Sequence, residues 1–203
     1  MSLGITANKE RNGALLAYIA GNIQGIHLRK LLKIVYLIDE HFTLRRCFPL
    51  TWFNYQAWEK GPVAPEVYEV KNGAFGEYVS CRREEEGGSN IVRPVVSSPY
   101  ELRKRMEDFS AYELQVIDSV LAEYGECTPE ELTELTHREG SLWSQVKEEN
   151  ALRFENGRSE VELPLTRLLG NDEEAEDRYA EALGNMEFQA ALNKHREENV
   201  QTA

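Results

Sequence analysis

Two segments near the start of the chain place apolar residues at helical spacing. Residues 14–23 carry an apolar face and are followed by Gly25, which indicates a helix that ends there. Residues 28–42 carry a wider apolar face, because their apolar positions follow the i, i+3, i+4, i+7 series with additional members. Such a wide face is typical of a helix with neighbours on several sides. We therefore predict that residues 28–42 form the central helix of the fold.

The next segments alternate between strand and turn signals. Residues 50–58 are rich in Trp, Phe and Tyr, which favours a strand. Lys60-Gly61-Pro62 follows, and we predict a turn there because Gly61 tolerates backbone angles that other residues avoid. Pro65 is expected to begin a short helix, since proline at a first helical position loses no hydrogen bond. Residues 78–82 and 91–96 are predicted to pair as a hairpin across the polar linker 84–90.

The second half of the chain carries explicit helix signals. Ser110 with Glu113, and Thr128 with Glu131, form S/T-x-x-E capping boxes ahead of apolar residues, so each pair predicts the start of a helix. The second of these helices should stop near Gly140, and residues 141–150 should add a short one. From residue 171 the pattern predicts two amphipathic helices on either side of Gly184.

These elements predict a mainly helical α+β fold with a small antiparallel β-sheet and a helical C-terminal extension. We divide the chain into an N-terminal segment at 1–11 that includes a possible tag remnant, a domain at 12–150 and the extension at 151–203.

Composition restricts the class of protein. The 203 residues contain no apolar stretch near the ~20 residues that a membrane helix needs, and the start of the chain lacks the pattern of a signal peptide. Cys47, Cys81 and Cys127 are odd in number, widely separated and without a C-x-x-C spacing, which fits reduced thiols. We therefore expect a cytoplasmic protein that does not contact a membrane.

The formal net charge of −12 disfavours nucleic-acid binding, since a phosphate backbone would be repelled. Arg82, Arg83 and Arg93 could form a local basic face, but we interpret them as ordinary solvated charges. No helix-turn-helix with a basic recognition helix is visible. We expect no nucleic-acid partner.

Three blocks in this sequence together resemble one known family. They are LLKIVYLID at 31–39, AWEKGPVAPEVY at 57–68 and ELTELTHREGSLW at 131–143. In content, order and spacing they resemble the signature of the Panacea domain, a SocA-like antitoxin family. The most specific piece is Lys60-Gly61-Pro62 after an aromatic segment. The resemblance spans roughly residues 12–147.

The resemblance implies a function in protein binding. Members of the family neutralise unrelated toxins, usually by direct contact, and a SocA-type member delivers its toxin to a bacterial protease. The implied partners are a cognate toxin and, for the delivery mode, a cytoplasmic protease or its unfoldase. The residues of the signature, with a structural or partner-binding role, are Lys33, Tyr36, Trp58, Lys60, Gly61, Pro62, Val63, Pro65, Tyr68, Leu135, Thr136, His137 and Trp143.

Two alternatives remain open at this stage. One is a hydrolase-like enzyme that uses His137, although no second metal ligand and no nucleophile lies at a suitable spacing. We interpret His137 instead as a helix-end histidine that hydrogen-bonds to the backbone, and we expect no catalytic residue, metal or cofactor. The other alternative is a prophage adaptor or structural protein without a toxin. The large aromatic residues Trp58, Trp143, Tyr36 and Tyr68 are interpreted as core.

Overall fold

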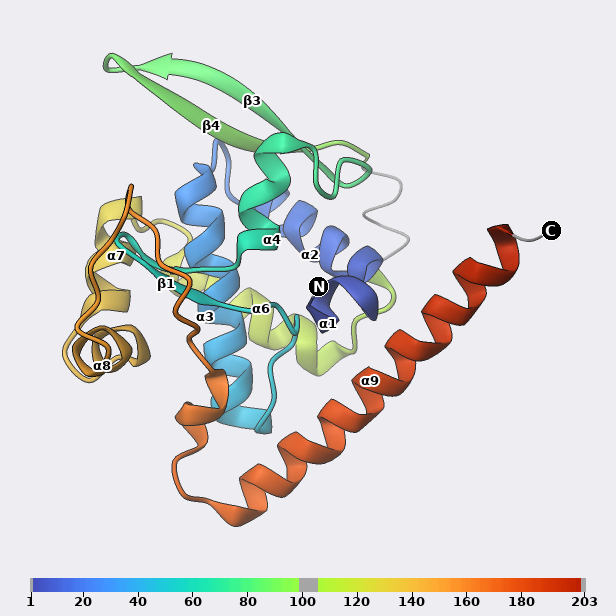
Figure 1. The fold of residues 1–203 in the computed structure, drawn as a ribbon. Coiled ribbons are helices and arrows are strands. Elements are labelled where there is room, and N and C mark those ends of the chain that lie inside the picture. Colours follow the sequence, from blue (N-terminus) through green and yellow to red (C-terminus); the bar gives the residue numbers. More distant parts are fainter. Residues whose placement is uncertain (1, 99–105, 202–203) are drawn as a thin grey trace.

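The computed structural model describes residues 2–98 and 106–201 (Figure 1). Met1, part of the possible tag remnant, lies outside the described residues. The helices and strands confirm a mainly helical fold with small antiparallel sheets. In chain order they are α1 (Leu3–Thr6), α2 (Lys9–Asn22), α3 (Leu28–Arg46), β1 (Gln56–Trp58), β2 (Gly61–Val63), α4 (Pro65–Tyr68), the 3₁₀ helix η1 (Glu69–Asn72), β3 (Val79–Glu86), β4 (Ser89–Val96), α6 (Ala111–Tyr124), α7 (Pro129–His137), α8 (Leu142–Glu149), the 3₁₀ helix η2 (Leu165–Leu169) and α9 (Glu173–Gln201).

Helix α3 is the central element, as its wide apolar face predicts. It contacts α2, α4, α6, α7, the strands β2 and β4, and η2. Buried side chains occur on all sides of it, including the charged residues Lys33 and Asp39. The helix ends at Cys47, whose φ of 68° places it in the left-handed conformation typical of helix ends.

Both capping boxes are present at the predicted positions. The Ser110 hydroxyl accepts a hydrogen bond from the Glu113 backbone N–H at 3.3 Å, and the Glu113 carboxylate accepts one from the Ser110 N–H at 2.7 Å. Thr128 and Glu131 are paired in the same way, at 3.2 and 2.7 Å. These bonds satisfy backbone donors that a helix otherwise leaves free at its start, which is why α6 and α7 begin where the sequence indicates.

The strand predicted at 50–58 is correct only for its last three residues. β1 pairs with β2 in a short hairpin, in which Trp58 faces Gly61 and Gln56 faces Val63, so residues predicted as part of a turn form a strand. Residues 50–55 are irregular because the backbone N–H groups of Leu50 and Thr51 donate to the Asp39 carboxylate, each at 2.8 Å, instead of to a neighbouring strand.

The second hairpin is confirmed and is longer than predicted. β3 and β4 stay paired from Val79 and Val96 out to Glu86 and Ser89, so most of the predicted linker belongs to the strands. Only Gly87 and Gly88 form the turn, with φ of 58° and 77°. Both signs are positive, as the tight turn that matches strand twist requires. The hairpin projects beyond the start of α3 (Figure 1).

The C-terminal part of the chain packs against the rest in two ways. Residues 155–163 run beside β1, where the N–H of Ala57 donates to Val161 O at 2.9 Å and that of Leu163 to Tyr55 O at 2.8 Å. The boundary at residue 150 stays a prediction. In the described part of the chain after residue 170, one helix, α9, runs through Gly184. The prediction of two helices on either side of Gly184 is therefore wrong. A single exposed glycine costs only about 1 kcal/mol in a helix, too little to break one this long.

Helix α9 lies along one side of the molecule, and its C-terminal end extends beyond the body (Figure 1). The Tyr179 ring lies 5.5 Å from that of Trp52, and the Asn193 amide donates to Thr6 O and Ala7 O at 3.2 and 3.1 Å. In the described ranges, no helix is both long and apolar enough to cross a membrane.

Candidate functional site

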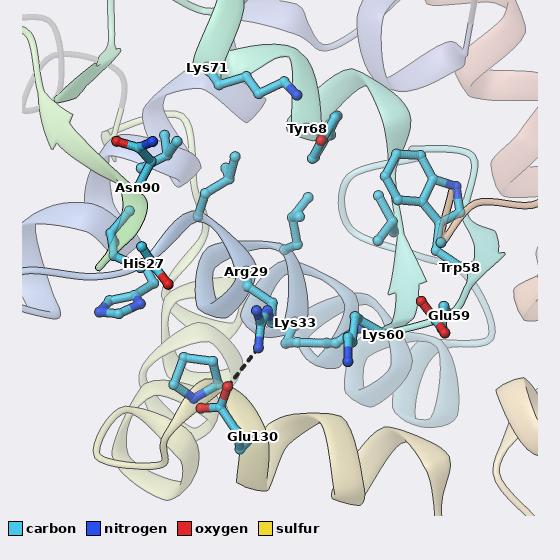
Figure 2. A pocket seen from close by; sticks show the side chains of 18 of the residues that line it. His27, Arg29, Lys33, Trp58, Glu59, Lys60, Tyr68, Lys71, Asn90 and Glu130 are labelled. Atoms are coloured by element: carbon cyan, nitrogen blue, oxygen red, sulfur yellow. Dashed lines mark hydrogen bonds and ion pairs between the residues drawn. The ribbon is translucent and has the colours of Figure 1, made fainter. Parts of the chain in front are cut away.

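An open cleft of about 890 Å³ separates the tip of the β3–β4 hairpin from the body of the molecule (Figure 2). The start of α3, the β1–β2 hairpin, α4 with η1, the loop at 156–158 and the start of α7 form its other sides. Clefts where several elements converge are the usual place for binding sites. Segments that are far apart in the sequence therefore contribute side chains to one surface.

Positive side chains outnumber negative ones in this cleft. Among the described residues, its lining contains five Lys or Arg side chains and three Glu side chains. The cations are Arg29, Lys33, Lys60, Lys71 and Arg158, and the acids are Glu59, Glu86 and Glu130. Glu130 pairs with Arg29 at 2.6 Å, the dashed line in Figure 2, and Glu86 pairs with Arg93 outside the lining. Two of the three carboxylates are thus neutralised within the protein.

One wall of the cleft is aromatic. The rings of Trp58 and Tyr68 meet edge to face with centroids 4.9 Å apart. The Arg158 guanidinium lies 4.8 Å from the Trp58 centroid and 5.1 Å from that of Tyr68, and the Lys71 ammonium lies 3.7 Å from the Tyr68 centroid. Hydrogen bonds from Lys71 and Arg158 lower the pKa of the Tyr68 hydroxyl, with burial acting in the opposite direction. Cations and rings thus hold one another in position.

Lys33 forms the floor of the cleft. Its side chain is 1% exposed, and its ammonium donates to Pro62 O at 3.2 Å. Burial lowers the pKa of Lys33 well below its ordinary value, and the nearby charge of Arg29 lowers it further. Gly61 has a φ of +105°, and a Cβ at this position would overlap the Lys33 ammonium and lie 2.8 Å from the Thr136 hydroxyl. Glycine is therefore required by its conformation and by the close approach of Lys33.

Behind the cleft, residues of the third signature block pack against residues of the second. The Trp143 indole N–H donates to Trp58 O at 2.9 Å, which ties α8 to β1. The His137 ring stacks on Trp143 with centroids 3.5 Å apart and an angle of 8° between the planes. The predicted hydrogen bond from His137 to the backbone is wrong for its Nε2, which is buried without a hydrogen-bond partner in the described part of the chain. The contact that positions His137 is therefore made by the face of its ring on Trp143.

A buried polar network lies further along α3, in its second half. The Asp39 carboxylate accepts hydrogen bonds from Leu50 N–H, Thr51 N–H and the Thr51 hydroxyl, and from the Tyr55 hydroxyl at 2.7 Å. Burial raises the pKa of Asp39 to about 6, although these bonds lower it. The Tyr36 hydroxyl donates to Glu40 at 2.9 Å, and its ring meets that of Tyr55 edge to face. Asp39 ends the first signature block, but its role as the acceptor for a separate segment has no local signal.

The structure brings together five of the predicted site residues as cleft lining: Lys33, Trp58, Lys60, Val63 and Tyr68. Gly61, Pro62 and Thr136 lie buried against Lys33 or beside it, and Trp143 is buried as predicted. Trp58 and Tyr68 are half-buried and face the cleft, so their interpretation as core is wrong. Tyr36 is core, Leu135 is half-buried against the core, and Pro65 begins α4.

Sequence reasoning missed several cleft residues, of which Arg29, Lys71 and Arg158 carry charge. Arg29 precedes the first block by two positions and Lys71 follows the second by three. Arg158 lies beyond all three blocks and reaches the cleft because its loop is fixed to β1, where Glu59 N–H donates to Gly157 O at 3.0 Å. Proximity to the blocks could have indicated the first two, but nothing local indicates Arg158.

The family model of the SocA-like antitoxin, Panacea domain, matches residues 31–144, which is more than half of the chain. This chain belongs to the Panacea domain family. The match confirms the resemblance carried by the three blocks, and it supports an antitoxin-type role. No curated protein and no solved structure matches the chain.

The matched residues of the Panacea domain supply the floor and the β1–β2 wall of the cleft, whereas Arg158 and the loop around it come from outside them. Membership of this family favours a non-enzymatic role. Among residues 2–98 and 106–201, no group of three or more His, Cys, Asp or Glu side chains is arranged to hold a metal ion.

The state of His137 predicts a specific pH dependence. Burial and the nearby lysines, Lys33 first, lower the pKa of His137 to about 4. The unfolded chain, with an ordinary pKa near 6.5, therefore binds a proton between pH 6.5 and 4 that the folded chain does not, so stability falls as pH falls through this window. We expect His137→Phe, which retains a flat ring, to lose less stability than the wild type on acidification.

Urea unfolding of both proteins at pH 7, 5.5 and 4.5 measures this effect. Asp39, whose pKa is raised, titrates in both proteins and cancels from the difference. A stability difference that stays constant with pH would contradict the assignment of a neutral, stacked His137.

Proposed function

We propose that this chain neutralises a cognate toxin protein in the cytoplasm by binding it at the cleft. The observation that carries the proposal is the position of the family signature: Lys33, Trp58, Lys60, Val63 and Tyr68 line one open surface. Trp58, Lys60 and Tyr68 reach the surface there, whereas Lys33 and Val63 are buried in the lining. Half-buried Trp and Tyr beside Arg are also the side chains that dominate the energetics of protein interfaces.

Binding can neutralise a toxin in two ways. The antitoxin either covers the active surface of the toxin or acts as an adaptor that delivers it to a protease or its unfoldase. Both modes begin with the same contact between the toxin and the cleft. The hydrolase alternative gains no support from His137, because its Nε2 is buried and its ring is stacked on Trp143.

Co-expression with the protein encoded by the neighbouring gene tests this function. We expect that protein to stop growth when expressed alone, and growth to return when this chain is co-expressed. The two proteins should co-purify. Following the toxin after its synthesis is stopped separates the two modes, since the toxin persists in a covered complex and disappears when it is delivered to a protease.

A pair of charge reversals tests whether the contact with the toxin lies at the cleft. Lys60 and Lys9 are both exposed, but only Lys60 lines the cleft. We expect Lys60→Glu to lose rescue and co-purification, while Lys9→Glu retains both. Equal rescue by the two variants would show that the contact lies outside the cleft. A neighbouring protein that is harmless when expressed alone would favour an adaptor or structural role without a toxin.

A further inference from the structure

We infer that the cleft binds an acidic segment of the partner protein and that one carboxylate of this segment is received by Lys33. This inference rests on the proposed function and gives the chemistry of the contact. An acidic segment is the complementary occupant because the cleft is positive within a chain whose net charge is strongly negative. Complementary potentials at an interface select the partner as well as speeding its approach.

Most of the positive charge in the cleft is available to a ligand. Lys33, Lys60, Lys71 and Arg158 form no ion pair with a carboxylate in the described ranges, whereas Arg29 does. The aromatic contacts of Lys71 and Arg158 fix the positions of these cations without neutralising them. Charges already held in place lose little conformational entropy when they bind, which favours affinity.

The start of α3 adds to this potential. The helix has 19 residues, and its first residues, Leu28 and Arg29, line the cleft. Its N-cap His27 provides no side-chain hydrogen bond, and its first turn contains no acidic residue. The positive end of the helix dipole and backbone N–H groups that no helical carbonyl satisfies therefore lie at the same surface as the four cations.

Lys33 gives the site a specific receptor at its floor. An ammonium has three donors, and only one hydrogen bond, to Pro62 O, is present in the described structure. Its side chain is almost completely buried, but its end lies at the floor of the cleft. Burial lowers the pKa of Lys33, and a carboxylate brought to the cleft floor would favour the charged ammonium and accept hydrogen bonds from its unused donors.

The aromatic wall favours a peptide over a nucleotide or nucleic acid. The edge of one ring lies against the other in the Trp58–Tyr68 pair, and the Arg158 guanidinium lies over both rings. The ring faces that Arg158 covers are not free for stacking, which is the main contact that single-stranded nucleic acids make with aromatic residues. Apolar side chains of a peptide can instead pack on Ile91 and Val92 of β4, which belong to the same lining.

Selection of peptides from a random dodecamer display library tests the inference without a toxin. The full chain is immobilised, and bound peptides are sequenced after repeated selection. We expect enrichment in Asp and Glu. One enriched peptide is then synthesised with a fluorophore, together with a version in which Asn and Gln replace Asp and Glu, and the affinity of each is measured by anisotropy. The acidic peptide should bind more tightly, and its affinity should fall as salt is raised.

Variants assign the binding to the cleft. We expect Lys33→Met and Arg158→Gln each to weaken the acidic peptide by at least about tenfold, since each removes a cation from the site. Lys9→Met, which removes an exposed lysine outside the cleft, should bind like the wild type. Arg158 is itself exposed, so its replacement keeps the fold even if Lys33→Met does not.

Three outcomes would overturn the inference. The first is selection of peptides without enrichment in Asp and Glu, and the second is equal binding of the acidic peptide by Arg158→Gln and the wild type. The third is displacement of the labelled peptide by millimolar ADP but not by the same acidic peptide without its fluorophore. Toxin rescue is measured separately. Rescue without acidic-peptide binding would reject only this inference, and peptide binding without a toxin would reject only the proposed function.

Discussion

Gly61→Ala is expected to lower the free energy of unfolding by about 3 kcal/mol. Part of the loss, about 1–2 kcal/mol, comes from placing a side chain at a positive φ. The rest comes from overlap, because the new Cβ would collide with the Lys33 ammonium and lie 2.8 Å from the Thr136 hydroxyl. Moving the Lys33 ammonium away from the new Cβ would disturb its hydrogen bond to Pro62 O. Urea unfolding measures the change.

Gly73→Ala is the matched control. Gly73 has nearly the same φ, +100° against +105°, but no heavy atom lies within 4 Å of the position that its Cβ would occupy. It should therefore lose only the conformational part, about 1–2 kcal/mol. Equal losses for the two variants would show that the close approach of Lys33 to Gly61 contributes nothing to the requirement for glycine.

Asp39→Ala is expected to be at least as damaging, with a loss of about 4 kcal/mol. The substitution leaves two backbone N–H groups, of Leu50 and Thr51, without their acceptor in the core. The Tyr55 hydroxyl also loses its shorter bond, at 2.7 Å, and among the described residues keeps only its bond to Val35 O of α3, at 3.3 Å. Thermal and urea unfolding report the loss.

Asp118→Ala and Asp39→Asn serve as controls for this effect. Asp118 is an exposed aspartate that accepts one hydrogen bond, from the Tyr18 hydroxyl at 2.8 Å, and its loss should cost less than about 1 kcal/mol. Asn retains one acceptor oxygen at position 39 and should fall between the two. A small effect of Asp39→Ala would mean that the Leu50–Tyr55 segment is held by its apolar contacts alone.

The sequence predicted the elements whose ends are fixed by residues close to one another in the chain. The capping boxes at Ser110 and Thr128 place backbone partners within three residues, so they were visible without a fold. The β3–β4 hairpin was also predicted, but with a linker at 84–90, whereas only Gly87 and Gly88 form the turn. Helix α3 was predicted from its apolar face, because a helix in contact with many neighbours must be apolar on most sides.

Predictions failed where a distant residue decides the conformation. Residues 50–55 have the composition of a strand, but Asp39 takes two of their backbone donors. Trp58 and Tyr68 have the size and apolarity of core residues, but only the fold reveals that they border a cleft. Arg158 could not be found at all, because its position depends on hydrogen bonds between the loop and β1.

Because residues 155–163 are attached to β1, a surface loop completes the rim of the cleft, and this loop can accept substitutions. At the floor of the cleft, the close approach of Lys33 and Thr136 leaves no space for a side chain at position 61. The rim is supplied by two tolerant pieces, the exposed hairpin tip at 86–90 and the loop at 156–158. Substitutions in these pieces can invert the charge or the width of the entrance while the floor and its lysine stay as they are. If the partner binds at the cleft, as we propose, a few surface substitutions are enough to fit this framework to a different partner.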